Sequence, residues 1–597
     1  MPAEKPKETS LRPLGLLSAE QAKQIDDAVH EQIARASLGL SPMAMALAAA
    51  DWAMHLASSP GRQMLLAQKA AQLLADEFTA LAAPASDAAA ASDNRFADPA
   101  WQEFPFRLLK ERFKTSEAWW REVVEVDGMS SHRRQMMSFF VQQWLDALSP
   151  SNWPLSNPEV WKQGAETGGR SLLDGWKLLL SDLGELAQAG RPADGAALPP
   201  LRYEVGRQVG ITPGKVVWRN QLIELIQYEP TTAKVQAEPL LIVPSPIMKF
   251  YILDLQPHNS MVRYLVAQGF TVFMVSWRNP DANDRELGVD DYLELGVMDA
   301  LRQSARLSAS PQVHAMGYCL GGTFLAIAAA QLCARDCKPA RKARPGDAPS
   351  LASVTLLAAQ TDFSEAGELG TFIDDDQLKA LRAQVARQGY LSGRQMAAAF
   401  QLLHAKDLVW ARNTQRYLLG AEEEGNDLMS WNADTTRLPA RMHSEYLDSL
   451  FLNNALADGH YRVQGMPVAM MNLKRPLMVV GTARDHVSPW RSVYKIHLLT
   501  DTDTSFILAS GGHNAGIVSE PGHANRSYQV GRVAAGHGWT DPDDWQKSAE
   551  RREGSWWEAW AGWLREHSSA EAPARAIDAA AALCDAPGEY VTVRYAD

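Results

Sequence analysis

The hexapeptide GYCLGG at residues 317–322 constrains the fold of this chain more than any other segment. An apolar run at 313–316 precedes it and predicts a buried strand, and the segment 323–332 after it has the composition of a helix. Glycines on both sides allow the backbone to turn sharply, because glycine adopts conformations that other residues avoid. The chain is therefore expected to pass from strand to tight turn to helix, with the Cys319 thiol exposed at the turn.

The pattern G-x-C-x-G matches the nucleophile elbow of α/β-hydrolases, in which serine usually stands in the middle. A lone cysteine is more often a small buried hydrophobe than a nucleophile. The flanking glycines favour the catalytic interpretation, so Cys319 is the predicted nucleophile. A thiol in this place favours transfer of acyl groups over hydrolysis of esters.

Length, charge and cysteine content limit the classes of protein to consider. A chain of 597 residues predicts two or three domains. Its net charge of −12 argues against a nucleic-acid partner. Four cysteines are too few and too irregularly placed for a disulfide framework. Cys333 and Cys337 are four residues apart, but no second cysteine pair or histidine pair accompanies them, so neither a metal nor a cofactor is predicted.

The sequence contains no targeting or membrane signal that we recognise. The segment MPAEKPK at 1–7 lacks the apolar stretch of a secretory signal. No apolar run approaches the roughly 20 residues that span a bilayer. These features predict a soluble protein of the reducing cytoplasm.

The hydrophobic pattern changes near residue 200. Residues 1–18 are predicted to be disordered, and residues 19–200 to form a helical N-terminal domain that ends in a Gly/Pro/Ala-rich segment. After it, short apolar runs alternate with helical segments, which indicates a largely parallel sheet in an α/β domain. The expected strands are 215–217, 222–228, 240–243, 271–275, 313–317, 354–358, 477–481 and 505–508.

An insertion interrupts this alternation. The α/β-hydrolase core is expected at 201–358 and 467–568, separated by a mostly helical segment at 359–466. Its place between two strands predicts a lid subdomain over the site. Residues 569–597 form an Ala-rich C-terminal tail. The predicted fold class is thus α/β, an α/β-hydrolase fold with an inserted lid and an N-terminal helical domain.

An α/β-hydrolase triad follows the order nucleophile, acid, histidine. Asp485 comes just after the strand expected at 477–481, and His513 lies in GGHNAG at 511–516, just after the next strand. Both positions are carboxyl ends of strands, where open α/β sheets place their sites. Cys319, Asp485 and His513 are therefore the predicted catalytic residues.

Each member of this triad has an alternative. Asp485 could instead be a turn residue or a helix N-cap, because Ser488-Pro489 follows closely. His314 is interpreted as a core histidine and His443 as a structural one. The histidines that compete with His513 for the catalytic role are His486, His497, His523 and His537.

An oxyanion hole needs two backbone N–H donors. The first predicted donor is Leu320, and the second lies in the loop 243–249 after an earlier strand. Proline has no N–H, so Pro244 and Pro246 leave Ser245, Ile247 or Met248, of which Ile247 is preferred. The alternative is that the two prolines only stiffen a turn.

Several segments together resemble the polyhydroxyalkanoate synthases, most closely the single-subunit class I type with a long N-terminal domain. The resemblance spans about residues 15–565, and SWRNPD and WNAD are its most specific segments. The segments are FADPAW at 96–101, SPSN at 149–152, NPE at 157–159, KFYILDL at 249–255, SWRNPD at 276–281, GYCLGG at 317–322, WNAD at 431–434, DHVSPW at 485–490, GHNAG at 512–516 and GSWW at 554–557.

The resemblance implies an acyltransferase that polymerises 3-hydroxyacyl-coenzyme A into polyester and releases coenzyme A. The family's nucleophile, acid and base correspond to Cys319, Asp485 and His513. These are the residues that their positions after predicted strands already indicate. It also implies association with polyester granules, and a homodimer is the family's expectation. The N-terminal helices are either structural or contact the granule or a second subunit.

Three further residues are candidates for substrate binding. Trp431 could line a substrate channel, or it could pack in the core of the lid. Arg278 and Lys249 could meet coenzyme A phosphates, but either could equally pair with a local acid.

The chain departs from the family pattern at Met248, where asparagine is usual, and at Asn514, where an aliphatic residue is usual. The tail from residue 570 has no recognised counterpart. Two other functions stay open at this point: a cysteine hydrolase of thioesters, lactones or polyesters, and a non-catalytic granule protein.

Overall fold

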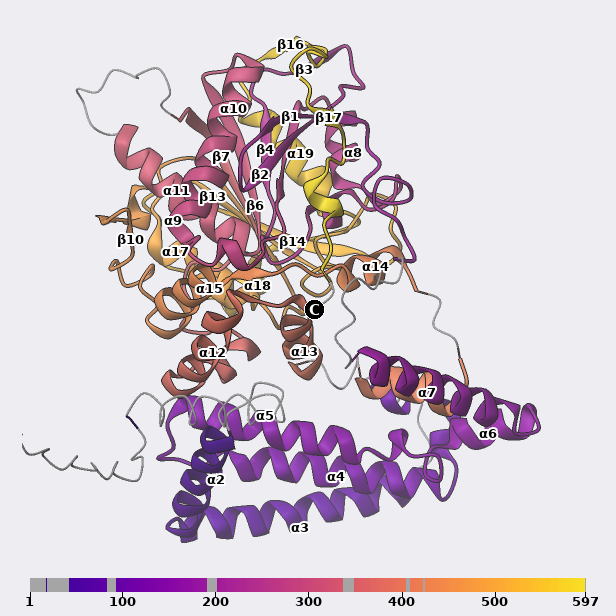
Figure 1. The fold of residues 1–597 in the computed structure, drawn as a ribbon. Helices are drawn as coiled ribbons and strands as arrows, with labels where there is room; N and C mark the ends of the chain where they lie inside the picture. The colour runs from indigo at the N-terminus through magenta and orange to yellow at the C-terminus, as the bar shows by residue number, and fades with distance from the viewer. Residues whose placement is uncertain are drawn as a thin grey trace, which may run out of the picture.

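The computed structural model describes residues 18, 42–82, 93–189, 201–336, 348–403, 409–421 and 425–595. A helical N-terminal region lies below an α/β domain, with the inserted segment between them (Figure 1). The predicted disordered start lies outside the described residues apart from Ser18, and so does Cys337. Within the described ranges, no helix is both long enough and apolar enough to cross a membrane.

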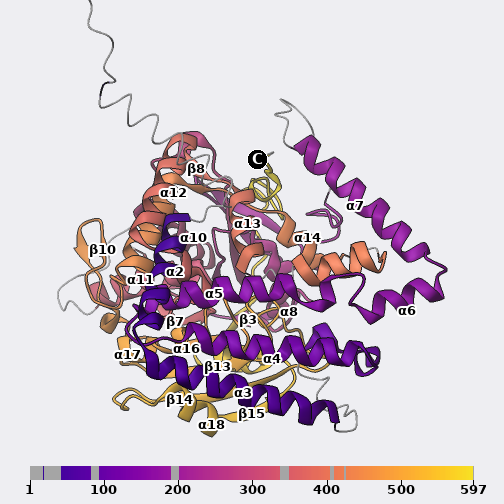
Figure 2. The same ribbon diagram turned by 90° about the horizontal axis from the view of Figure 1, so that it is seen from below.

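The N-terminal region is helical, as predicted. Seen from below, α2 to α5 form one layer, and α6 and α7 extend to its side (Figure 2). Arg95 joins two of these helices, because its guanidinium lies 3.1 Å from both Glu117 on α4 and Asp146 on α5. The helices are α2 (Pro42–Ala57), α3 (Pro60–Ala82), α4 (Phe106–Val124), α5 (Ser131–Leu148), α6 (Pro158–Glu166) and α7 (Arg170–Ala189).

The α/β domain is built on one mixed sheet of eleven strands in the order β15-β14-β13-β12-β7-β6-β4-β5-β2-β1-β17. The strands from β13 to β5 in this order run parallel to one another, and the strands at both edges are antiparallel. The parallel strands are β4 (Leu240–Val243), β5 (Val272–Trp277), β6 (Gln312–Tyr318), β7 (Ser350–Leu357), β12 (Leu477–Thr482) and β13 (Thr504–Ala509).

Register brings the carboxyl ends of the central strands to one edge. The last residue of β6, Tyr318, pairs with Leu357, the last residue of β7. The last residue of β12, Thr482, likewise pairs with Ala509 at the end of β13. The turns that follow these strands therefore meet at the same end of the sheet, where α/β folds place their sites.

All eight expected strands are present, including β1 (Gly214–Arg219) and β2 (Ile223–Tyr228), with ends shifted by a few residues. The antiparallel edge strands β14 (Ser527–Val533) and β15 (Glu550–Glu553) were not predicted. Every residue of β15 is exposed and charged, so it carries no hydrophobic alternation. Charged edge strands of this kind prevent further pairing, and they give little sequence signal.

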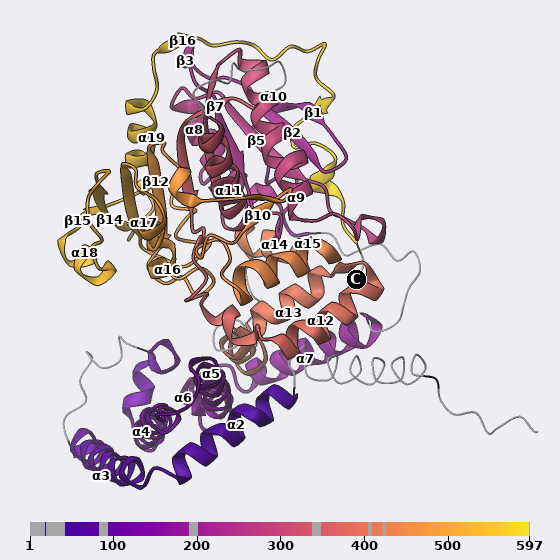
Figure 3. The same cartoon turned by 90° about the vertical axis from the view of Figure 1, so that its left-hand side faces the viewer.

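The inserted segment lies between β7 and β12, as predicted. Figure 3 shows its helices between the sheet and the N-terminal helices. Several contacts join it to the N-terminal region. Among them, Phe139 of α5 packs edge-on against Phe372 at 5.0 Å, and Asp182 of α7 pairs with Arg416 at 2.6 Å. Its helices are α12 (Asp375–Gln388), α13 (Gly393–Leu403), α14 (Asp427–Ala433) and α15 (Ala440–Tyr446).

The C-terminal tail is part of the folded domain. Within it, β16 (Glu571–Pro573) pairs with β3 (Lys234–Gln236), and β17 (Cys584–Asp585) adds an edge strand to β1. The chain then runs to the insertion, where the Arg437 guanidinium lies 3.7 Å from the ring centroid of Tyr595. The tail thus connects the sheet to the inserted segment.

His314 lies inside β6 and is fully buried, which confirms its interpretation as a core histidine. Its ring nitrogens lie 2.7 Å from Ser353 Oγ and 3.1 Å from Ser568 Oγ. Burial lowers the pKa of His314 to about 4, although the Glu238 charge opposes the shift. The ring is therefore neutral in the folded protein at neutral pH.

We predict that His314 makes the protein less stable in acid. The unfolded chain takes up a proton below about pH 6.5, and the folded chain does so only near pH 4, so stability falls between these values. Urea unfolding of His314→Gln at about pH 7 and pH 5 should show a loss on acidification about 2 kcal/mol smaller than in the wild type. The exposed His537→Gln is the control, and equal losses in all three proteins would contradict the prediction.

Candidate active site

The elbow has the geometry that the hexapeptide predicts. Cys319 follows β6 directly and has a left-handed backbone with φ of 53°. Methyl groups would not fit at the neighbouring glycines: a Cβ on Gly317 would lie 2.4 Å from Gly322 Cα, and one on Gly321 would lie 2.3 Å from the Pro244 carbonyl oxygen. A non-glycine residue keeps a left-handed backbone only where the surrounding structure imposes it, and the close packing around Cys319 does so.

The helix after the elbow supplies the first predicted oxyanion donor. α11 (Leu320–Asp336) begins at Leu320, whose N–H has no acceptor inside the helix because the first turn of any helix lacks one. β4 lies beside β6, with Val243 opposite Gly317, so the loop 244–249 leaves the sheet next to the elbow. The predicted second donor is therefore on a neighbouring loop.

Asp485 and His513 meet at the same edge of the sheet. His513 Nδ1 lies 2.8 Å from Asp485 Oδ2, which also accepts a hydrogen bond from Thr482 Oγ1 at 2.9 Å. The other carboxylate oxygen accepts from the backbone N–H groups of Val487 and Ser488 at 2.9 and 2.8 Å. Asp485 thus caps the following turn and holds the histidine at the same time, so its two sequence interpretations are compatible.

Electrostatics favour the charged form of His513. Burial alone would lower the pKa of His513, but the Asp485 charge, the Cys319 charge and hydrogen bonds to both side chains raise it well above its usual range. A cationic imidazole beside a thiol stabilises the thiolate, which is the reactive form of cysteine. The arrangement is therefore suited to a thiolate–imidazolium pair.

The competing histidines lie in other settings. His486 is more than half exposed, and its Nδ1 lies 3.6 Å from Glu368 Oε1. His443 is buried inside α15, which fits its structural interpretation. Burial lowers the pKa of His497 to about 4. His523 and His537 are exposed.

The loop 244–249 is held on several sides. Trp277 Nε1 donates to the Pro244 carbonyl at 2.9 Å, and Thr436 Oγ1 donates to the carbonyls of Pro246, at 3.2 Å, and Ile247. The Ile247 N–H is directed to Ser245 Oγ at 3.3 Å. Which N–H of this loop serves as the second oxyanion donor stays a prediction.

Lys249 and Trp431 belong to a buried polar cluster. Lys249 Nζ lies 2.9 Å from Asp434 Oδ1, and both side chains are almost fully buried. Trp431 Nε1 donates to the Lys249 carbonyl at 2.7 Å, and Tyr251 OH donates to Asp434 Oδ2 at 2.9 Å. Burial lowers the pKa of Lys249, and the Asp434 charge opposes this. These contacts favour the alternatives given above, in which Lys249 pairs with a local acid and Trp431 packs in the core of the inserted segment.

Arg278 is also paired locally, because it contacts Asp284 and donates from Nε to the Gln221 carbonyl at 2.6 Å. Substrate binding by Arg278, Lys249 and Trp431 stays a prediction.

Two tyrosines at the site were not predicted. The Tyr318 ring stacks on His513, with centroids 5.6 Å apart and an interplanar angle of 29°. Tyr446, at the end of α15, packs against Phe451 at 5.2 Å. Burial and the Cys319 charge raise the pKa of Tyr446 well above its usual range. Tyr318 lies in the elbow hexapeptide, at a position that the G-x-C-x-G pattern leaves open, and Tyr446 lies in no motif, so only their neighbours in space could reveal their place at the site.

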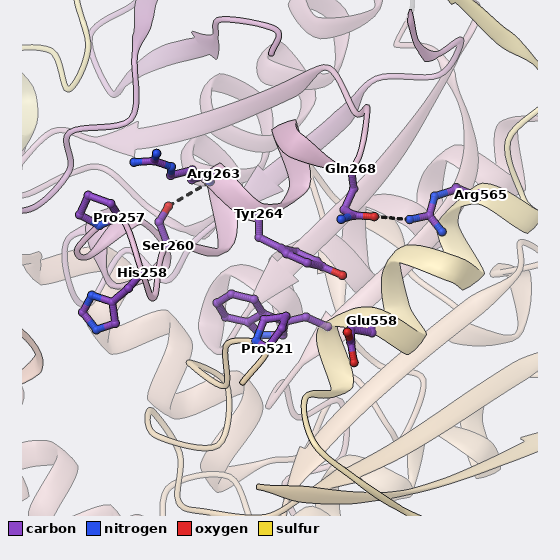
Figure 4. A pocket seen from close by; sticks show the side chains of 10 residues that line it. Pro257, His258, Ser260, Arg263, Tyr264, Gln268, Pro521, Glu558 and Arg565 are labelled. Atoms are coloured by element: carbon purple, nitrogen blue, oxygen red, sulfur yellow. Dashed lines mark hydrogen bonds between the residues drawn. The ribbon is translucent and has the colours of Figure 1, made fainter. Parts of the chain in front are cut away.

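A surface hollow of about 610 Å³ lies between α8 (Met261–Ala267) and α19 (Trp556–Glu566) (Figure 4). Its lining includes Tyr264, Trp557 and Arg565 but none of the three predicted catalytic residues. Trp557 Nε1 donates to the Ile517 carbonyl at 2.9 Å, so one wall of the hollow supports the loop after His513.

In the described part of the chain, no group of three or more His, Cys, Asp or Glu side chains is arranged to hold a metal ion.

The sheet order, the elbow and the acid–histidine pair define a protein of the α/β-hydrolase class whose elbow carries a thiol. The α/β-hydrolase fold model matches residues 239–520. A solved monoacylglycerol lipase from Paleococcus ferrophilus, 14% identical, covers 57% of this chain and 99% of its own, with a TM-score of 0.30.

The comparisons also identify the family. The model described as the poly-beta-hydroxybutyrate polymerase (PhaC) N-terminus matches residues 92–265, and a second N-terminal model of that polymerase matches 20–62. A poly(3-hydroxyalkanoate) polymerase of Methylorubrum extorquens is 38% identical over 84% of this chain and 81% of its own. The polymerase subunit PhaC of Cupriavidus necator is 36% identical over 84% and 83%. The chain therefore belongs to the poly(3-hydroxyalkanoate) polymerase family, whose members are acyltransferases.

We predict that Asp434 is needed to keep Lys249 buried. Asp434→Ala leaves an unpaired ammonium in the core, which costs about 3–5 kcal/mol of unfolding free energy. The matched control is Asp448→Ala, which breaks an exposed pair with Arg382 and should cost less than about 1 kcal/mol. Urea unfolding measures both, and similar losses in the two variants would contradict the prediction.

Proposed function

We propose that this protein polymerises 3-hydroxyacyl-coenzyme A into polyester with release of coenzyme A, through an acyl thioester on Cys319. The observation that carries the proposal is the chain of contacts from the Cys319 thiol through His513 to Asp485, within a member of the polymerase family. Asp485 orients His513 and stabilises its charged form, and Leu320 N–H is the proposed oxyanion donor.

The first step transfers the acyl group to the enzyme. His513 takes the thiol proton, and the Cys319 thiolate attacks the carbonyl carbon of the substrate thioester. The bond from carbon to the coenzyme A sulfur breaks, and that sulfur leaves with the proton held by His513. One thioester replaces another, so the step is close to balanced and the acyl group remains activated.

The second step forms the ester. The 3-hydroxyl of another hydroxyacyl unit gives its proton to His513 and attacks the acyl carbon on Cys319. The carbon–sulfur bond breaks, the proton returns to sulfur, and an oxygen ester is formed. This step is downhill because an oxygen ester is more stable than a thioester, and repetition builds the polymer.

Polymerisation requires that water is kept from the acyl group, because water competes with the hydroxyl. We propose that the inserted segment keeps water from the site. Tyr446, at the end of its α15, packs against Phe451 of η11 (Leu447–Leu452), and the Cys319 charge contributes to the raised pKa of Tyr446, which supports the proposal.

The N-terminal helices are proposed to contact the polyester granule, where the protein would then be found. On α6 and α7, Trp161, Leu173 and Trp176 are more than half exposed. Exposed apolar faces on amphipathic helices are typical of proteins that bind apolar surfaces. The homodimer stays a prediction.

The test is release of coenzyme A from 3-hydroxybutyryl-coenzyme A, with analysis of the product. Wild type should release coenzyme A and form insoluble polyester, and Cys319→Ala should lower the rate by about 10⁴-fold or more. The matched control is Cys333→Ala, which changes a buried cysteine on α11 that does not touch the acid–histidine pair.

Three outcomes would contradict the proposal. Free hydroxy acid as the only product would make the protein a hydrolase. Full activity of Cys319→Ala would remove the proposed nucleophile. Granule binding without turnover in the wild type would favour a non-catalytic granule protein.

A further inference from the structure

The loop that carries His513 is attached to the strand that carries Cys319. Tyr318, the last residue of β6, donates its hydroxyl proton to Asn514 Oδ1 at 2.6 Å. The same hydroxyl lies 3.4 Å from the His513 carbonyl oxygen, within hydrogen-bond distance. The Tyr318 side chain is buried, and Asn514 is partly exposed.

Asn514 is held through its backbone as well. Its carbonyl accepts hydrogen bonds from the N–H groups of Ile517 and Val518 at 3.1 and 2.9 Å. Gly516 N–H donates to the Gly512 carbonyl at 2.8 Å, which closes the turn around the histidine. Tyr318 therefore connects to a compact turn, and movement of that turn would move the His513 ring.

The ring of Tyr318 acts on His513 directly. It stacks on the imidazole at a centroid distance of 5.6 Å, while Asp485 holds Nδ1 of the same imidazole. One residue thus contacts the His513 ring with its own ring and approaches the His513 backbone with its hydroxyl. The aliphatic residue usual in the family at position 514 would offer no acceptor to this hydroxyl.

We propose that Tyr318 and Asn514 form a positioning pair that holds the His513 ring between Asp485 and Cys319. The inference rests on the proposed function and adds to it two residues that act through the histidine. Asn514 is then the nearer acceptor of the Tyr318 hydroxyl, at 2.6 Å compared with 3.4 Å for the His513 carbonyl.

The protonation states are consistent with this role. Burial, with the Cys319 and Asp485 charges, raises the pKa of Tyr318 well above its usual range, so its hydroxyl remains a donor over the working pH range. The titratable groups that interact with the imidazole are Asp485 and Cys319, with Tyr318 stacked on it, and Tyr446 of the inserted segment interacts electrostatically with Cys319.

The test is a double-mutant cycle of Tyr318→Phe and Asn514→Leu. Each single variant breaks the Tyr318–Asn514 hydrogen bond and should lower kcat about tenfold, with KM within about twofold of wild type. The double variant lacks the same hydrogen bond as each single variant, so it should be no slower than either of them. Tyr264→Phe is the matched control, because Tyr264 lies in the surface hollow away from the triad.

A second measurement follows the pH dependence of Cys319 alkylation, which reports on the cysteine–histidine pair without substrate turnover. Iodoacetamide alkylates the Cys319 thiolate, and a displaced histidine stabilises that thiolate less. The pH midpoint of alkylation should therefore rise by about half to one unit in each single variant, and by no more than that in the double variant. This measurement remains informative if the wild type makes no polymer, so failure of the proposed function and failure of the positioning pair are distinguishable.

The cycle also defines the results that would overturn the inference. Additive losses, with the double variant slower than either single variant, would mean that the two residues act independently. Alkylation midpoints equal to that of wild type in both single variants would mean that the pair does not set the position of His513.

Discussion

The close packing of the elbow against the loop after β4 is the constraint on which the rest of the site depends. A side chain at Gly321 would collide with the Pro244 carbonyl, and one at Gly322 would meet the Ala359 side chain. Because no side chain fits at either position, glycine is required just after Cys319. Cys319 itself has a left-handed backbone, which sets the direction of its thiol and of the Leu320 N–H.

Segments far apart in the sequence then complete the site around this fixed point. Asp434 of the insertion contacts Lys249 and Tyr251 at the end of the loop beside the elbow, and Arg594 of the tail lies 3.4 Å from the same carboxylate. The insertion and the tail therefore stabilise the loop from two sides. The tail would be expected to influence the site although it contains no catalytic residue.

Much of the fold was predictable because its signals are local. Apolar runs in the sequence indicate the central strands. The glycines on both sides of Cys319 indicate a tight turn between a strand and a helix. The order of Cys319, Asp485 and His513 could be predicted because each follows a recognisable strand. The edge strand β15 was missed because an exposed, charged strand has no hydrophobic pattern.

The other omissions concern contacts across the fold. The alanine-rich composition of residues 569–597 predicted no strand, but β17 pairs with β1 and β16 pairs with β3. Asn514 was noted only as a departure from the family pattern, and its partner Tyr318 lies 196 residues earlier in the chain. A hydrogen bond over such a separation leaves no mark in one sequence.

The central claim is that Cys319 carries the growing acyl chain. It is tested most directly by mixing the protein with 3-hydroxybutyryl-coenzyme A, quenching in acid, and analysing the peptide that contains residues 317–322 by mass spectrometry. The account predicts one or more hydroxybutyryl units on Cys319, removable by hydroxylamine at neutral pH as thioesters are. Polymer formation with an unmodified Cys319 and hydroxybutyryl units on another residue would contradict it.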